Sequence, residues 1–171
     1  MHKKIPALFF LYVAFCLGLM AQTTQPTDVL LVSGKVKMER TFNLDDIRKI
    51  KPVSLEDVNT SCSPKKKDQA KNVKAILVKD LLDSVKFQYT SPKMLNRFYF
   101  RFEGSDGYTI VFSFNEIYNT ETGNHLYLVT EMNGQDISKM ENRILLLTTT
   151  DLKSGTRNIK GLSRIVVCQA D

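Results

Sequence analysis

Beyond residue 21 the chain carries only two cysteines, Cys62 and Cys168, and a single histidine, His125. A zinc site built from cysteine and histidine needs three or four ligands, and the sequence offers no recognisable spacing of carboxylates that would complete one. A Ser-His-Asp or Cys-His hydrolase would depend wholly on His125. Because His125 follows Thr122-Gly123-Asn124 directly before a strand-like run, we interpret it as a solvated loop residue.

The two cysteines leave several chemistries open. Cys62 is followed closely by the basic run Lys65-Lys66-Lys67, and neighbouring cations favour a thiolate that could bind a metal. In an oxidising compartment Cys62 and Cys168 could instead close a long loop as a disulfide. Free thiols are the third alternative, and the basic run by itself is most simply a solvated surface.

The first residues of the chain have the pattern of a secretory signal peptide. A cationic head, Lys3-Lys4, precedes an apolar run from Ile5 to Met20, and polarity rises after Ala21. A membrane anchor needs about twenty apolar residues, and this run is slightly shorter. We therefore predict a signal peptide over residues 1–21, a linker over 22–27, and export of a single domain over 28–171. No later segment of the sequence could span a bilayer.

Composition excludes one class of partner. Removing Lys3 and Lys4 leaves 22 of the 24 basic residues against 18 acidic ones, a formal charge of +4. This mild surplus falls short of a nucleic-acid footprint, which clusters Lys and Arg on one face with stacking aromatics. We expect an unknown protein or a small anionic ligand as the partner, and no nucleic acid. The remaining length, about 150 residues, suits one domain with one core.

In the amino-terminal half, short segments alternate between strand and helix patterns. Residues 28–38 are expected to form one strand with a bend at Gly34, and residues 41–50 a helix capped by Asn43. A short strand over 53–58 and a long polar loop over 59–74 follow. Apolar residues at helical spacing then predict an amphipathic helix over 77–85, with Leu81 and Leu82 on its apolar face.

The carboxy-terminal half is rich in strands. Residues 98–102 and 108–112 flank Asp106-Gly107, whose types suit a tight turn, so they predict a β-hairpin in which Asp106 and Tyr108 are turn and strand residues. A helical turn over 114–118 and strands over 126–130, 144–149 and 159–167 follow. Strands and short helices without regular βαβ alternation indicate an α+β fold with a mostly antiparallel or mixed sheet.

The order of these elements resembles the molybdopterin-binding domain of sulfite-oxidase-type oxidoreductases. The likeness spans nearly all of residues 28–171, and the segments that carry it are Leu31 to Val36, Val78 to Asp83, Asp106-Gly107-Tyr108, Phe114 to Ile117, Leu126 to Glu131, Asn133 to Ile137, Arg143 to Leu146 and Asn158 to Ile165. The resemblance implies a sulfite-oxidase-type fold of layered β-sheets with a few short helices. It also implies a molybdenum ligand at Cys62 and pterin contacts from Arg143 and Lys160.

The chain departs from the pattern of this family at several positions. Cys62 lacks the glycine and the flanking arginine of the family's metal-binding loop, and Glu141 and Asn142 replace the glycine and proline usual before Arg143. A large anionic pterin must be buried by many donors, so these losses together weaken its site. We therefore expect a minimal or degenerate member, a binding or accessory protein without bound molybdenum. The alternative is a small molybdopterin-dependent oxidoreductase that passes electrons to a separate redox partner.

Overall fold

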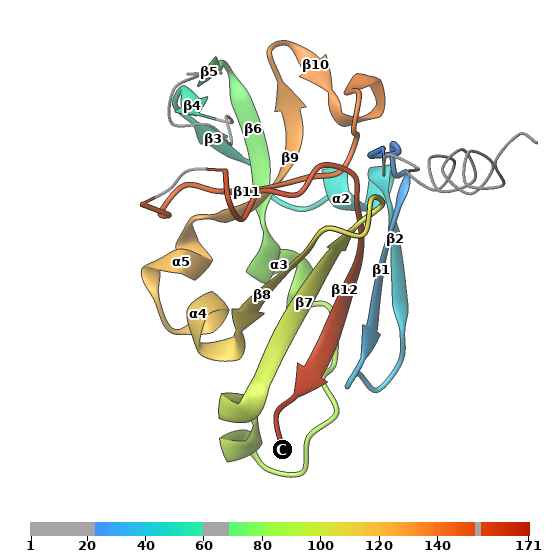
Figure 1. The fold of residues 1–171 in the computed structure, drawn as a ribbon, viewed down its shortest axis with the longest axis vertical. Helices are drawn as coiled ribbons and strands as arrows, with labels where there is room; N and C mark the ends of the chain where they lie inside the picture. Colours follow the sequence, from blue (N-terminus) through green and yellow to red (C-terminus); the bar gives the residue numbers. More distant parts are fainter. Residues whose placement is uncertain (1–22, 60–68, 153–154) are drawn as a thin grey trace, which may run out of the picture.

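The computed structural model of the chain describes residues 23–59, 69–152 and 155–171 (Figure 1). The predicted leader over residues 1–21 and the candidate ligand Cys62 lie outside these ranges. The described residues form an α+β arrangement of β-sheets with a few short helices, as the sequence predicts.

The first sheet has five strands in the order β2-β1-β12-β7-β8. Strands β1 and β12, from opposite ends of the described chain, pair in parallel, and the other neighbours are antiparallel. The sheet is therefore mixed. Its strands are β1 (Val29–Gly34), β2 (Arg40–Asn43), β7 (Phe98–Gly104), β8 (Thr109–Ser113) and β12 (Leu162–Gln169).

The second sheet is antiparallel and has the order β10-β9-β6-β3, with β11 also paired to β9. A short two-stranded ladder of β4 and β5 lies beside it. The strands are β3 (Val53–Leu55), β4 (Val58–Asn59), β5 (Gln69–Ala70), β6 (Val73–Leu77), β9 (Leu126–Met132), β10 (Gln135–Asp136) and β11 (Leu145–Thr148).

Short helices connect the strands, and reciprocal side-chain caps fix where two of them begin. Asn43 accepts a hydrogen bond from the Asp46 backbone N–H, whose own carboxylate accepts from the Asn43 N–H. Ser113 and Glu116 form the same reciprocal pair, which satisfies amide groups that the first helical turn leaves open. The helices are α2 (Leu44–Arg48), α3 (Val78–Leu82), α4 (Phe114–Tyr118), α5 (Glu121–Asn124), η2 (Pro92–Arg97) and η3 (Ile137–Lys139).

Strand β9 is buried on both faces, so the second sheet separates two apolar clusters. Leu126 and Leu128 belong to the main cluster, which they share with the first sheet and α3. Tyr127 and Val129 belong to the smaller cluster on the opposite face. Successive side chains of a strand point to opposite faces, which explains the alternation. The main core therefore lies between the two sheets.

The structure corrects several predicted boundaries. The first strand ends at Gly34, where φ is +91°, and does not continue with a bend to residue 38. Residues 40–43 form β2 rather than the start of a helix, because they pair with β1. Residues 73–77 form β6 between β9 and β3, so the helix that follows spans only Val78–Leu82 and the polar loop is shorter than expected. The predicted hairpin of residues 98–102 and 108–112 is confirmed by the pairing of β7 with β8.

Candidate functional site

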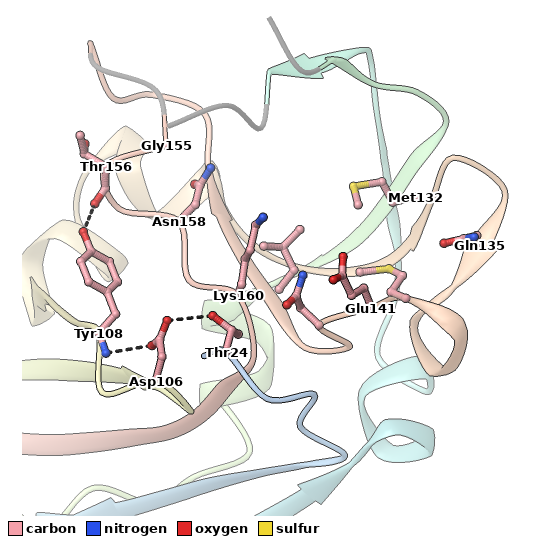
Figure 2. A pocket seen from close by; sticks show the side chains of 13 residues that line it. Thr24, Asp106, Tyr108, Met132, Gln135, Glu141, Gly155, Thr156, Asn158 and Lys160 are labelled. Carbon is pink, nitrogen blue, oxygen red and sulfur yellow. Dashed lines mark hydrogen bonds between the residues drawn. The ribbon is translucent and has the colours of Figure 1, made fainter. Parts of the chain in front are cut away.

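A pocket among the described residues lies where segments from distant parts of the chain meet. It has a volume of about 610 Å³ and is lined by residues of the amino-terminal segment, the β7–β8 turn, the β9–β10 hairpin, and the loops on either side of β11 (Figure 2). Four of the sequence strings that carry the family resemblance, those at 106–108, 133–137, 143–146 and 158–165, contribute lining residues. Small-molecule sites typically occupy 300–1,000 Å³, so the size is suitable for an organic ligand.

Asp106 and Tyr108 build one wall and are held by hydrogen bonds within the protein. One Asp106 carboxylate oxygen accepts the Tyr108 backbone N–H at 2.9 Å, and the other accepts the Thr24 hydroxyl at 2.9 Å (Figure 2). The Tyr108 hydroxyl donates to the Thr156 carbonyl at 2.6 Å. Gly107, with φ at +81°, makes the turn between them possible. These bonds support the interpretation of Asp106 and Tyr108 as structural residues that also line the pocket.

Residues 23–28, called here the amino-terminal strap, contribute Thr24 to the pocket wall. The Ser105 hydroxyl donates to the Gln25 carbonyl at 2.7 Å, and the Gln25 backbone N–H lies 2.8 Å from the same hydroxyl oxygen. Thr27 donates to the Leu162 carbonyl at 2.9 Å. The strap passes so close to Gly161 that a Cβ there would lie 2.5 Å from the Gln25 carbonyl oxygen. Residues 22–27, predicted as a linker, thus include part of the pocket wall.

The structure places the two predicted pterin-binding residues in different surroundings. Lys160 lines the pocket. Arg143 does not line it; its guanidinium pairs with the Asp28 carboxylate of the strap, and its backbone adopts a left-handed φ of +53°. Arg143 therefore fastens the strap to the loop before β11.

The rest of the pocket combines an apolar floor with polar side chains. Met140 and Leu145 are buried and Met132 is half-buried, and all three line the pocket. Glu141, Asn142 and Gln135 line it as well. The charged side chains around the pocket are thus one ammonium, on Lys160, and two carboxylates, on Asp106 and Glu141.

A second cation near the pocket, the Arg157 guanidinium, is already bound by partners within the protein. The Arg157 guanidinium donates to Asp151 at 2.5 Å and to Glu116 at 3.1 Å, and it stacks 4.2 Å from the centroid of the Phe112 ring. The hydrogen bond to Asp151 raises the Arg157 pKa further above its ordinary value. Arg157 is consequently unavailable as a ligand for an anion in the pocket.

The other candidate residues lie apart from this site. The His125 Nδ1 is 3.4 Å from the Tyr127 hydroxyl and 3.3 Å from that of Thr149, in a separate hollow. Its side chain is 43% exposed, which agrees with a solvated histidine. Cys168, on β12, is a half-buried free thiol, and Cys62, its candidate disulfide partner, lies outside the described residues. Within the described ranges, no group of three His, Cys, Asp or Glu residues is placed to hold a metal ion.

Sequence reasoning missed most of the pocket lining. Thr24, Met132, Met140 and Glu141 come from a predicted linker, a strand end and two loop positions. Nothing in their types or spacing marks them as neighbours. The available signal is the family resemblance, whose strings at 106–108, 133–137, 143–146 and 158–165 include lining residues.

Comparisons with known proteins indicate a distant likeness in fold. No family model matches the sequence, and no curated protein matches it. Among solved structures, the chain is similar to the sulfane dehydrogenase SoxCD from Paracoccus pantotrophus, with a TM-score of 0.56 and 12% sequence identity. The match covers 81% of this chain and 37% of that one, so this chain spans little more than a third of its length. At this identity the likeness concerns the fold alone.

The helices of the described residues are all short. None of them is both long and apolar enough to cross a membrane.

Proposed function

We propose that the protein is an exported, single-domain binding protein of the sulfite-oxidase-type fold that holds a small organic ligand and carries no molybdenum. One observation carries the proposal: a pocket of about 610 Å³ that joins an apolar floor to a small number of polar groups. Such a combination is typical of small-molecule sites, in which the apolar surface supplies affinity and the polar groups fix orientation. Export is proposed from the leader pattern of residues 1–21.

The described residues do not fit a pyranopterin. That group carries a phosphate and needs several cationic or N–H donors around it. In the described part of the pocket, Lys160 is the single cation, and the carboxylates of Asp106 and Glu141 share the same lining. Arg143 is paired with Asp28 outside the lining. We therefore assign no step of chemistry to such a cofactor in this protein.

Metal analysis of the native protein tests the proposal. Protein exported by its own host under molybdate supply should contain molybdenum far below one atom per chain. Cys62→Ser should leave the fold and the metal content unchanged, and Cys168→Ser, at a half-buried thiol outside the pocket, is the matched control.

A different result would favour the second candidate function, which the fold likeness to the sulfane dehydrogenase SoxCD supports. Near-stoichiometric molybdenum that is lost in Cys62→Ser but kept in Cys168→Ser would contradict the binding-protein proposal. The protein would then be a small oxidoreductase that transfers electrons to a separate redox partner, with Cys62 as its metal ligand.

A further inference from the structure

Two opposite charges on the pocket wall have no partner within the part of the chain that the structure describes. Lys160 and Glu141 both line the pocket, and neither forms a hydrogen bond or an ion pair there (Figure 2). They also do not pair with each other. A charged group that faces a pocket without a protein partner is available to a ligand of opposite charge.

The other charged side chain in the lining behaves differently. Both oxygens of the Asp106 carboxylate accept hydrogen bonds, from Thr24 and from the Tyr108 backbone. Asp106 therefore stabilises the pocket wall, and its negative charge still repels an anionic ligand. The two charges left for ligand recognition are the Lys160 ammonium and the Glu141 carboxylate.

The apolar part of the pocket lining is adaptable. Met140 and Leu145 are 5% and 7% exposed, and Met132 is half-buried beside them. Methionine side chains are flexible and polarizable, so they adjust to ligands of different shape and make favourable contacts with aromatic rings. This floor suits the apolar body of a ligand, not a second charged group.

Two neutral side-chain amides in the lining can orient a ligand by hydrogen bonds. Asn142 and Gln135 line the pocket and have no side-chain partner within the described ranges. An amide supplies both donors and an acceptor, so it can bind either end of a dipolar head group. The described lining therefore offers one cation, one anion, neutral amides and an apolar surface.

We infer that the ligand of the proposed binding protein is a zwitterion with an apolar body, in the class of α-amino acids and short peptides that carry an apolar side chain. Its carboxylate pairs with Lys160, its ammonium with Glu141, and its side chain rests on Met132, Met140 and Leu145. This inference rests on the proposed function, because it names the ligand class of the same pocket. It replaces the small anion that composition alone suggested.

A set of matched compounds tests the inference. The probes are L-phenylalanine, N-acetyl-L-phenylalanine without the ammonium, L-phenylalaninamide without the carboxylate, and inorganic phosphate. Binding is followed by NMR of protein labelled with ¹³C in the methionine methyl groups, which places the ligand at Met132 and Met140. We expect L-phenylalanine to bind about tenfold more tightly than either derivative, since each lost ion pair removes about one power of ten.

Variants assign each charge to its partner. Lys160→Gln should abolish the tighter binding of L-phenylalanine relative to L-phenylalaninamide. Glu141→Gln should abolish the tighter binding of L-phenylalanine relative to N-acetyl-L-phenylalanine. Both side chains are exposed, and unchanged urea midpoints would confirm that the variants fold. Lys86→Gln, an exposed lysine outside the pocket, should leave all affinities unchanged.

Three results would overturn the inference: equal affinity for the three phenylalanine compounds, tightest binding of phosphate, or no shift of either methionine methyl with any probe. None of these changes the molybdenum content, which tests the proposed function separately. Phosphate bound in a protein free of molybdenum would keep the binding function and replace the zwitterion by an anion.

Discussion

Replacing Gly161 by alanine should detach the amino-terminal strap from the pocket. Gly161 has φ at +62°, and a Cβ at this position would lie 2.5 Å from the Gln25 carbonyl oxygen and 3.0 Å from the Thr24 Cγ2. The left-handed backbone alone costs alanine about 1 kcal/mol. The backbone contact at 2.5 Å cannot be relieved by a rotamer change, so the strap must move.

The expected loss is larger than the backbone strain. Moving the strap breaks the hydrogen bond from Thr24 to Asp106 and the two between Gln25 and Ser105. Two of these hydrogen bonds are exposed and one is part-buried, so we assign about 0.5 kcal/mol to each, the low end of the range for hydrogen bonds. Together with the strain, Gly161→Ala should lower the free energy of unfolding by about 2–3 kcal/mol, measured by urea denaturation of a chain that begins at Gln22.

Gly134→Ala is the matched control. Gly134 has φ at +74°, but no atom lies within 4 Å of where its Cβ would be, so only the strain of about 1 kcal/mol applies. In a chain that begins at Pro26, Thr24 and Gln25 are gone, and the Ser105 hydroxyl, which would lie 2.8 Å from the Cβ, loses its bonds to Gln25 and can rotate away. Gly161→Ala should then cost no more than Gly134→Ala. If both substitutions lowered the free energy of unfolding equally in the chain that begins at Gln22, the close contact between the strap and Gly161 would be refuted.

The other predictions concern stability, pH and processing. Leu81→Ala should lower the free energy of unfolding by about 2–5 kcal/mol because this leucine is fully buried. Lys79→Ala removes one exposed hydrogen bond and should lower it by about 0.5 kcal/mol. Equal shifts of the denaturant midpoint in the two variants would contradict the orientation of α3. Hydrogen bonds from Ser138 lower the pKa of Asp136 from 3.8 to about 2, so this carboxylate stabilises the fold above pH 4 and the contribution is lost as pH falls toward 2. Its side chain is 44% exposed, so screening reduces the effect to about 1 kcal/mol, and Asp136→Asn should remove that part of the acid dependence in urea titrations between pH 5 and 2. Amino-terminal sequencing of the exported protein should give a start directly after Ala21, and full-length protein held in a membrane fraction would be the contrary result.

Local signals allowed several elements to be predicted. The hairpin of β7 and β8 forms where Asp106-Gly107 separates two alternating apolar runs, and the Asn43 cap begins α2 as expected. These features depend on residues a few positions apart, and their energetics are largely local. The burial of Leu81 and Leu82 also follows from spacing, even though the helix that carries them is shorter than predicted.

The secondary-structure predictions are wrong where a segment pairs with a strand that is distant in the sequence. The sequence pattern predicts a polar loop up to residue 74 and a helix from residue 77, but the backbone of residues 73–77 pairs with β3 and β9, and this pairing decides their conformation. Residues 40–43 form a strand for the same reason, because they pair with β1. Tertiary pairing overrides local propensity when it satisfies backbone groups and buries side chains together.

The sequence by itself determined the class of fold, the short helices with their caps, and the scarcity of cysteine and histidine that argues against familiar metal and hydrolase sites. Only the tertiary structure decided that Lys160 faces a pocket while Arg143 pairs with Asp28, and that Glu141 and two methionines join that pocket. The strap, the β7–β8 turn and the loops around β11 meet because β12 lies in parallel beside β1 and antiparallel to β7. Such contacts join residues far apart in the chain, and they become favourable only when the whole core is buried, so no local pattern encodes them.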